Sequence, residues 1–521
     1  MAGFILPKKR RGIIISNISS STSTIAAIDL GSNSFHMVVA EEREGQLVIL
    51  DRIREMVRLA AGLDAKGNLD PAVEQAALDC LQRFGQRLRD LPSDSVSAVG
   101  TNTLRNTRNA DQFLREARER LGHPIEIISG IEEARLVYQG VVHLLEPDQR
   151  DKLIIESGGG STELIIGRDF NPRMMESLEM GCVTMTRQFF PDGKITSKRI
   201  NKARIAVLQK MKPVRNSFRN QGWDVVIGAS GTNKSAGSVA RELGLVQPGG
   251  DVSDQALREI LKQIQKFDKI DAIQLRGLSE RRVPVFLGGI IVLAGVFEAL
   301  GIDFMQVSEG ALREGLLYDM LGRRHNRDIR NQSISQLAGR FHTDSDQAQR
   351  MQQTVLGFLD QVVSQWGLDA VESRRLLQWA CETHEIGLDI AHSSYHKHSA
   401  YVIENADLAG FSQQEKRRLG VLVRAHRGKL SGKLFNQLAQ NSASPVVKLV
   451  VLLRLAVIFH RSRANVAVPQ LGIDVDGQAL NIRIPTDWLE QHPLTLNDLE
   501  QEADYLAALE YRLTVNQAAP A

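Results

Sequence analysis

Cysteine is scarce in this chain of 521 residues, which has only Cys80, Cys182 and Cys381. The three are far apart and odd in number, so a disulfide framework is excluded and a reducing compartment is favoured. No Cys/His spacing typical of structural zinc occurs. We therefore expect a cytoplasmic protein.

Long apolar runs are also scarce. No run approaches the roughly 18 residues that a membrane-spanning helix needs, so we expect no membrane partner. The basic start, Lys8 to Arg11, is followed by an apolar segment too short for a signal peptide. Residues 1–23 are predicted to be a flexible basic tail. A composition of 43% hydrophobic and 24% charged residues is typical of a soluble globular protein, and the length predicts several domains.

Carboxylates are missing from one long stretch. Between Lys416 and Arg463 there are eleven Lys or Arg residues and no Asp or Glu. Such a stretch cannot neutralise itself locally and is predicted to present positive potential to an anionic partner. The alternative is a solvated helix face whose partners come from other segments.

Two turns rich in glycine and serine stand out. Asp29 precedes the turn Gly31-Ser32-Asn33, and Glu156 precedes the turn 158–161, each between two apolar segments that are predicted to be strands. Glycine lets backbone N–H groups approach an anion, and the carboxylate can hold a metal ion or a water. The segment Val225 to Thr232 repeats the pattern without the acid. The sequence therefore predicts a phosphate site, although ordinary hairpin turns are the alternative.

Strands and helices alternate through residue 320, and the pattern begins again near residue 136. This indicates an α/β architecture made of two similar halves. Arg105 follows a predicted strand at Val96–Gly100, and Glu132 and Glu133 open a helix after the strand that begins at Ile125. A Glu pair suits the positive end of a helix dipole, so spacing alone does not decide which of them faces a cleft.

Six segments together resemble one family. Residues 27–36, 129–135, 158–163, 180–183, 228–232 and 309–315 are similar to the motifs, in order, of the exopolyphosphatase/guanosine pentaphosphate phosphohydrolase family, which belongs to the actin, Hsp70 and sugar-kinase superfamily. The resemblance implies two ribonuclease-H-like domains, 24–135 and 136–323, with a cleft between them. It also implies a homodimer.

The resemblance implies roles for individual residues. Glu133 would be the general base and Arg105 a ligand of the transferred phosphate. Asp29, Glu156 and Glu163 would surround Mg²⁺ and water, with a monovalent cation such as K⁺ as a further cofactor. The phosphate donors would be Ser32, Asn33, Gly158, Gly159, Gly160, Ser161, Gly231 and Thr232.

One position departs from the family pattern. The second turn in the family usually follows Asp-Ile, whereas this chain has Glu156-Ser157. Glutamate keeps the charge but moves the carboxylate outward by one methylene. A displacement near 1 Å in such a site can cost about a hundredfold in rate.

Residues 324–521 have a mainly helical pattern. Residues 379–388 resemble an HD-type phosphohydrolase domain, but the pair is His384-Glu385 and the later helix at 453–457 has no Asp. We therefore expect no complete metal site in a helical HD-like domain at 324–442, which a small α+β end at 443–521 would close. Instead we expect a path for a polyanion, lined by His396, Lys397, His398, Arg417, Arg418, Arg424 and Arg427.

These observations favour an exopolyphosphatase that hydrolyses the terminal phosphoanhydride of inorganic polyphosphate. The close alternative is removal of the 5′ γ-phosphate of guanosine pentaphosphate, pppGpp, which gives ppGpp. Two others are a low-turnover regulator that binds polyphosphate or an alarmone, and an actin-like ATPase or sugar kinase. No sequence-specific nucleic acid is expected as a partner.

Overall fold

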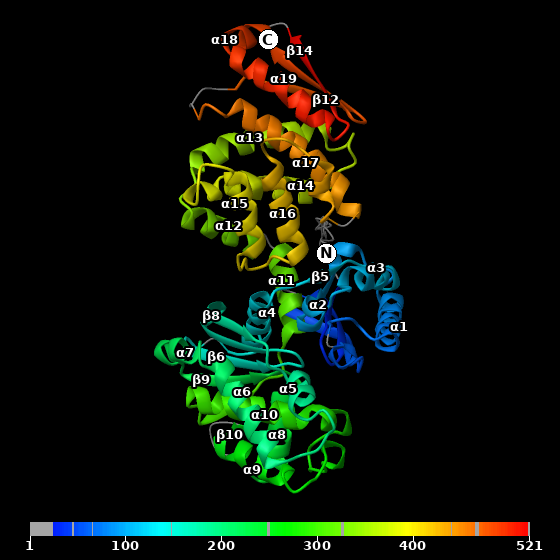
Figure 1. Cartoon of the computed structure of the whole chain (residues 1–521), viewed down its shortest axis with the longest axis vertical. Helices are drawn as coiled ribbons and strands as arrows, with labels where there is room; N and C mark the ends of the chain where they lie inside the picture. The colour runs from blue at the N-terminus through cyan, green and yellow to red at the C-terminus, as the bar shows by residue number, and fades with distance from the viewer. Residues whose placement is uncertain are drawn as a thin grey trace, which may run out of the picture.

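The computed structural model describes residues 24–43, 46–64, 66–146, 148–246, 251–324, 328–438, 440–463 and 468–518. The predicted tail at 1–23 lies outside these residues. The molecule is elongated (Figure 1), with one sheet domain at one end of the long axis and a small α+β unit at the other.

The first sheet has five strands in the order β3-β2-β1-β4-β5. They are β1 (Thr24–Leu30), β2 (Phe35–Arg43), β3 (Gln46–Glu55), β4 (Val96–Gly100) and β5 (Ile125–Ile127). Helices α1 (Pro71–Leu88) and α3 (Ala110–Leu121) pack together and bury their apolar faces in the core of this sheet, while α2 (Asn102–Asn106) follows β4. Asp70 caps α1 by accepting from the amides of Ala72 and Val73, and Pro71 suits the first helical position.

The second sheet has six strands in the order β10-β11-β9-β6-β7-β8. They are β6 (Asp151–Ser157), β7 (Thr162–Arg168), β8 (Asn171–Leu178), β9 (Val225–Ala229), β10 (Val252–Ser253) and β11 (Phe304–Val307). Without the edge strand β10, the order and the directions of pairing repeat those of the first sheet, three antiparallel strands followed by two parallel ones. The prediction of two similar α/β halves is confirmed.

Helices surround the second sheet. They are α5 (Cys182–Phe189), α6 (Ser197–Met211), α7 (Arg215–Gln221), α8 (Ser230–Glu242), α9 (Asp254–Ile264) and α10 (Val283–Leu300). The third turn of the sequence therefore leads from β9 into helix α8, and not into a strand like the other two turns.

Two helices are long and apolar enough to cross a membrane, at Glu280–Leu300 and Ser442–Phe459. The expectation that no apolar run approaches this length was wrong. In both helices most of the apolar window is buried inside the fold, 78% in the first and 61% in the second. Helix α10 is apolar on all sides because it lies within the core of the second domain.

Helices α4 (Gly130–Val142) and α11 (Leu312–Arg324) pack against each other between the two sheets. Their backbones approach closely, because a Cβ on Gly140 would lie 2.0 Å from the carbonyl oxygen of Ala311 and one on Gly315 would lie 1.8 Å from that of Leu136. Both helices share one core with side chains from both sheets. The expected domain boundary at residue 135 therefore falls inside a helix that serves both halves.

The C-terminal half is helical up to residue 459. Its helices are α12 (Ile329–Arg340), α13 (Ser345–Val362), α14 (Ala370–Thr383), α15 (Tyr395–Asn405), α16 (Gln413–Ala425) and α17 (Gln440–Phe459). A small unit follows, with β12 (Gly472–Asp476), β13 (Ala479–Pro485), α18 (Thr486–Gln491), α19 (Pro493–Ala507) and β14 (Arg512–Ala518). One continuous core joins the helices to this unit, and the expected boundary at residue 442 falls inside α17.

Candidate active site

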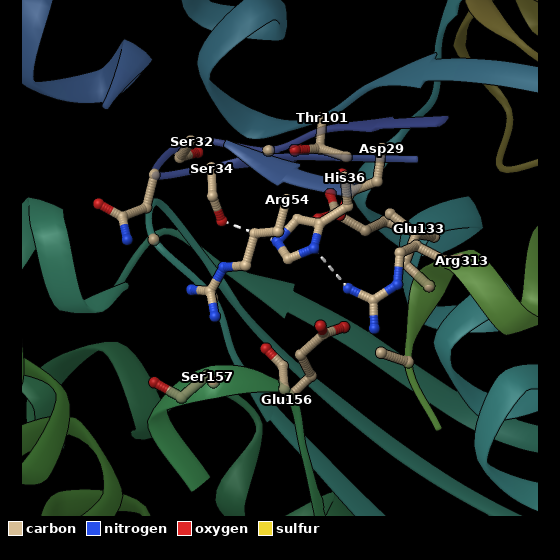
Figure 2. A pocket seen from close by; sticks show the side chains of 18 of the residues that line it. Asp29, Ser32, Ser34, His36, Arg54, Thr101, Glu133, Glu156, Ser157 and Arg313 are labelled. Atoms are coloured by element: carbon tan, nitrogen blue, oxygen red, sulfur yellow. Dashed lines mark hydrogen bonds between the residues drawn. The ribbon is translucent and has the colours of Figure 1, made fainter. Parts of the chain in front are cut away.

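A cavity of about 300 Å³ lies between the two predicted turns (Figure 2), and residues of both turns line it. The turns pack tightly, because a Cβ on Gly159 would lie 2.9 Å from Cβ of Ser32 and one on Gly160 would lie 2.2 Å from Oδ1 of Asn102. Only glycine leaves room for this approach. Seven of the predicted phosphate donors line the cavity: Ser32, Asn33, Gly158, Gly159, Gly160, Ser161 and Gly231.

Thr232, the eighth predicted donor, lies beneath the cavity. Its side chain is buried, and its Oγ1 accepts a hydrogen bond of 2.9 Å from Nη2 of Arg282. The start of α8 therefore uses Thr232 to hold an arginine that itself lines the cavity. The structure thus gives this hydroxyl a partner within the protein.

Three carboxylates line the cavity, those of Asp29, Glu133 and Glu156. Burial raises the pKa of Asp29 to about 7, and burial with the charges of Glu133 and Asp29 raises the pKa of Glu156 to about 8. Within the described residues, neither Oδ1 of Asp29 nor Oε2 of Glu156 has a hydrogen-bond partner. Two buried oxygens of this kind indicate a place for a cation.

The donor set fits Mg²⁺. This ion commonly binds through one or two carboxylates together with substrate phosphates, and keeps several waters. The described ranges hold no group of three or more side chains that could bind a metal without such help. Asp29 and Glu156 are the residues with oxygens free for this role.

Glu163 lies directly opposite Glu156 in the pairing of β6 with β7, but it does not line the cavity. Its Oε1 accepts a hydrogen bond of 2.8 Å from Ser177. Burial, followed by the charges of Glu133 and Glu156, raises its pKa well above the usual value. The structure therefore places the third predicted carboxylate behind the other two.

Glu133 is the member of the Glu pair that faces the cavity, as the resemblance implies. Ser129 caps α4 by accepting from the amide of Glu132. Glu132 and Glu133, in the first turn of this helix, point in different directions. Glu132 binds Arg135 through both oxygens. Burial raises the pKa of the Glu133 carboxyl, and the Arg105 guanidinium opposes this shift.

Arg105 lies next to Glu133 and not on the cavity wall. Its Nη1 donates to Oε2 of Glu133 at 2.8 Å and to the carbonyl oxygen of Ile128 at 2.9 Å. In this conformation the guanidinium orients the carboxylate of Glu133. A direct contact with the transferred phosphate stays a prediction.

The sequence reasoning missed the cations on the cavity wall, which are Arg52, Arg54, Lys234, Arg282 and Arg313. Arg313 belongs to the motif at 309–315, so its segment was visible although no role was assigned to it. Arg54 lies near the end of strand β3 and Arg282 directly precedes α10, so these two residues, far apart in the sequence, meet only in the folded chain. Lys234 pairs with Glu309, and Arg52 and Arg313 lie near Glu314. Arg54 and Arg282 have no carboxylate partner among the described residues, so the wall is suited to an anion.

His36 holds Arg313 in place (Figure 2). Nη1 of Arg313 donates to Nδ1 of His36 at 2.8 Å, and Nε2 of His36 lies 2.8 Å from Oγ of Ser34. Because Nδ1 accepts, Nε2 carries the proton and donates to Ser34. Burial, then Arg313 and Arg54, lower the pKa of His36 well below its usual value, so the ring is neutral.

The basic stretch from Lys416 to Arg463 finds many of its partners in other segments. Arg418 pairs with Glu372, Arg454 with Glu502, Arg461 with Asp498 and Arg463 with Glu385. The expectation that this whole stretch presents positive potential was therefore wrong. The fold supplies carboxylates that the linear sequence does not show.

A smaller group of cations lies together on α15, on α16 and just after the end of α16. Burial and the charges of Arg427, Lys397 and Arg424 lower the pKa of His396 to about 4. Among the described residues, none of these three cations forms an ion pair with a carboxylate. We name His396, Lys397, Arg424 and Arg427 the basic cluster. Of the other predicted path residues, His398 and Arg417 lie on the same two helices, and Arg418 pairs elsewhere.

Comparison with known proteins shows which family this chain resembles. The model of the Ppx/GppA phosphatase family matches residues 38–324, and the model of its domain III matches residues 329–503. An exopolyphosphatase structure from Cytophaga hutchinsonii is 23% identical, with a TM-score of 0.52, over 57% of this chain and 98% of that one. A structure named exopolyphosphatase-like protein is 24% identical, with a TM-score of 0.51, over 58% and 98% of the two chains. These likenesses show a shared fold.

Proposed function

The chain belongs to the Ppx/GppA phosphatase family and is a phosphoanhydride hydrolase, and from that premise we propose that it releases orthophosphate from the end of inorganic polyphosphate. The observation that carries this proposal is the cationic wall of the cavity, Arg52, Arg54, Lys234, Arg282 and Arg313, opposite two glycine-rich turns. A row of adjacent phosphates is the ligand that uses all of these donors at once.

The terminal phosphoryl group would lie between the turns. Backbone N–H groups of the turn 158–161 and the guanidinium of Arg313 would donate to its oxygens, while Arg54 and Arg282 would bind the phosphates that follow. Magnesium held by Asp29 and Glu156 would supply charge neutralisation to the phosphate oxygens. Phosphoryl transfer depends mainly on such positioning and charge stabilisation.

Glu133 would act as the general base. A water in line with the terminal phosphorus attacks it, the bond to the bridging oxygen breaks, and the proton of the water passes to Glu133. The shortened polyphosphate leaves with the electron pair of the broken bond, and the cations of the wall offset its charge. Arg105 would orient the carboxylate of Glu133 through their ion pair and oppose the rise in its pKa that burial causes.

Polyphosphate is favoured over guanosine pentaphosphate by the basic cluster of the helical domain. Its unpaired cations would bind the rest of a long polyanion, whereas a short nucleotide leaves them without a partner. Guanosine pentaphosphate stays the close alternative, because its phosphates would use the same cavity. The regulator and the ATPase or kinase interpretations give way to the family match. The homodimer and the cytoplasmic location stay predictions.

The test measures phosphate release with Mg²⁺ from long-chain polyphosphate and, separately, from guanosine pentaphosphate. We expect turnover of polyphosphate by the wild type, a large loss in Glu133→Gln, and a measurable rate in Glu156→Asp, which restores the usual family residue. A wild-type protein that acts on guanosine pentaphosphate alone would overturn the substrate assignment. If the wild type is inactive and Glu156→Asp is active, glutamate at position 156 is the cause of the low turnover.

A further inference from the structure

A second cavity of about 300 Å³ lies inside the helical domain, away from the two sheets. The side chains that matter for its chemistry come from α14 to α17 and the segments between them: His384, Glu385, Tyr395, Arg427, His460 and Arg463. We name it the domain III cavity. None of these residues lines the cavity between the two turns. Arg427 also belongs to the basic cluster, and the hydrolysis proposed for that cavity uses none of the others.

His384 offers an acceptor to this cavity. Only 3% of the residue is exposed, and its Nδ1 donates to the carbonyl oxygen of Cys381 at 2.8 Å. Burial lowers the pKa of His384, so the ring is neutral and its Nε2 carries a lone pair. Within the described ranges this Nε2 has no hydrogen-bond partner, and the nearest charged oxygen is Oε1 of Glu385 at 3.7 Å. This Nε2 can therefore accept from a donor that enters the cavity.

The cations of the domain III cavity are arginines. Arg463 pairs with Glu385, so a guanidinium already occupies the position beside the carboxylate where a metal ion would bind. The described residues also contain no cluster of metal-binding side chains here. Arg427 lies 4.7 Å above the ring of Tyr395 and has no carboxylate partner in the described part of the chain.

We propose that the domain III cavity binds a small phosphomonoester that also carries hydroxyl groups, such as a sugar phosphate. Arg427 pairs with the phosphate, because a planar guanidinium matches phosphate oxygens and this one is otherwise unpaired. Nε2 of His384 and the carboxylate of Glu385 accept hydrogen bonds from the hydroxyls. A volume of about 300 Å³ suits a ligand of this size.

Inorganic polyphosphate does not satisfy the same groups. Its oxygens are acceptors at neutral pH, so it offers no donor to His384 or Glu385. The ligand must combine an anion with hydroxyl donors. This requirement separates the domain III cavity from the phosphate site between the turns, and its test does not depend on which substrate is hydrolysed there.

The test is calorimetric titration of the full chain with ribose 5-phosphate, ribose and inorganic phosphate. We expect ribose 5-phosphate to bind, and each of the two fragments to bind at least about tenfold more weakly. Arg427→Met, which keeps the apolar stem over Tyr395, should weaken ribose 5-phosphate by about tenfold or more. Lys429→Ala is the matched control, an exposed cation two residues away, and should change nothing.

Arg313→Ala separates the two cavities, because ribose 5-phosphate could also enter the cavity between the turns. Binding that survives Arg313→Ala and is lost in Arg427→Met supports the proposal. Binding lost in Arg313→Ala and kept in Arg427→Met would overturn it, as would no binding at all. Inorganic phosphate that binds as tightly as ribose 5-phosphate would disprove the role of His384 and Glu385 as hydroxyl acceptors. His384→Phe, which removes the acceptor, should weaken ribose 5-phosphate by about tenfold or more, and unchanged binding would disprove its role.

Discussion

Glu132 and Glu133 are neighbours with different partners. Glu133 lines the cavity and pairs with Arg105, whereas Glu132 pairs with Arg135 and accepts from the amide of Gly410 at 2.8 Å. Both carboxylates are buried, so burial does not distinguish them. They differ in what they contact: Glu133 lines the cavity between the turns, whereas Glu132 contacts the helical domain.

This difference predicts opposite effects of one substitution. Glu133→Gln should lower phosphate release by about 10²- to 10⁴-fold, because a general base is lost. Glu132→Gln should instead lower the free energy of unfolding by about 3 kcal/mol, because it leaves the buried Arg135 poorly paired. Urea denaturation and a phosphate assay on both variants measure this. Unchanged activity in Glu133→Gln would show that another group accepts the proton.

Glu156 is the position at which this chain departs from its family. The environment of this side chain predicts that it lowers the free energy of unfolding of the metal-free protein. Its Oε2 is buried without a partner, and the charges of Glu133 and Asp29 act on the same side chain. Glu156→Gln should raise the free energy of unfolding without Mg²⁺ by about 1 kcal/mol, as is usual when a functional carboxylate is removed. The same change should weaken Mg²⁺ binding by about tenfold or more.

Thermal melts with and without Mg²⁺ check this prediction. The wild type should gain melting temperature with Mg²⁺, and Glu156→Gln should gain much less. Glu176→Gln is the control, since Glu176 lies on strand β8 of the same sheet, outside the cavity. Equal gains in wild type and Glu156→Gln would remove Glu156 from the metal site.

Helix α4 carries the candidate base and also holds the helical domain. Two hydrogen bonds join the helical domain to α4 and to strand β5. The amide of Gly410 donates to Glu132 of α4, and the amide of Ile127 in β5 donates to Oε1 of Gln414 at 3.0 Å. Asp319 of α11 binds Arg135 and Arg323, and Arg323 also donates to the carbonyl oxygen of Gly410. A buried charge network therefore fixes α4, α11 and the helical domain to one another.

Removal of one charge from this network should be costly. Although burial alone would raise the pKa of Asp319, Arg135 and Arg323 lower it to about 2. Asp319→Asn should lower the free energy of unfolding at pH 7 by about 3 kcal/mol, since the buried guanidinium of Arg135 and the partly exposed one of Arg323 lose a partner. The control is Asp254→Asn, which breaks an exposed pair with Arg258 and should cost under about 1 kcal/mol. Equal costs in chemical denaturation would show that the network does not stabilise this junction.

His460, at the end of α17, predicts a pH dependence of the helical domain. Burial and the charge of Arg350 lower its pKa to about 4, while its Nε2 lies 2.7 Å from Oγ1 of Thr354. Between pH 6.5 and 4 the unfolded chain binds a proton at this ring and the folded chain does not, so stability falls as pH falls through this window. His460→Gln should lose less stability than the wild type over the same range, measured by denaturation at pH 7 and pH 5. Equal losses would contradict the assignment.

The strands and turns of the two halves were predictable because their signals are local. Asp29 and Glu156 each end an apolar strand before a glycine-rich turn, and the structure places both at the same cavity. Helix α10 was misjudged because its residues are apolar on all faces, a pattern that a buried helix shares with a membrane span. The third turn resembled the others in composition, but Ser230 begins a helix there.

Contacts between distant segments could not be predicted. Arg54 and Arg282 join the cavity wall from strand β3 and the start of α10, and neither has a local motif. Likewise, Glu372 and Glu502 neutralise Arg418 and Arg454 from 46 and 48 residues away. Charge patterning along the sequence therefore overestimates the positive surface, since the fold decides which cations keep their charge unpaired.

The basic cluster lies on the helical domain, which the elongated molecule places beside the two sheet domains (Figure 1). If Lys397 and Arg424 guide a long polyanion, their effect depends on chain length and on salt, because a cation that neutralises a phosphate releases counterions. A substrate of three phosphates should use the cavity between the turns alone. A chain of many phosphates should use both regions.

The double substitution Lys397→Ala with Arg424→Ala should therefore raise KM for long-chain polyphosphate, reduce its dependence on salt, and leave tripolyphosphate hydrolysis unchanged. The loss of two contacts should lower the slope of log affinity against log salt by about one to two, by analogy with single-stranded polyanions. Arg418→Ala is the matched control, because Arg418 lies on the same helix as Arg424 but pairs with Glu372. Steady-state kinetics at several salt concentrations decide the matter. If long and short chains respond alike to the double substitution, the basic cluster does not contact the substrate, and its cations serve the domain III cavity or the fold instead.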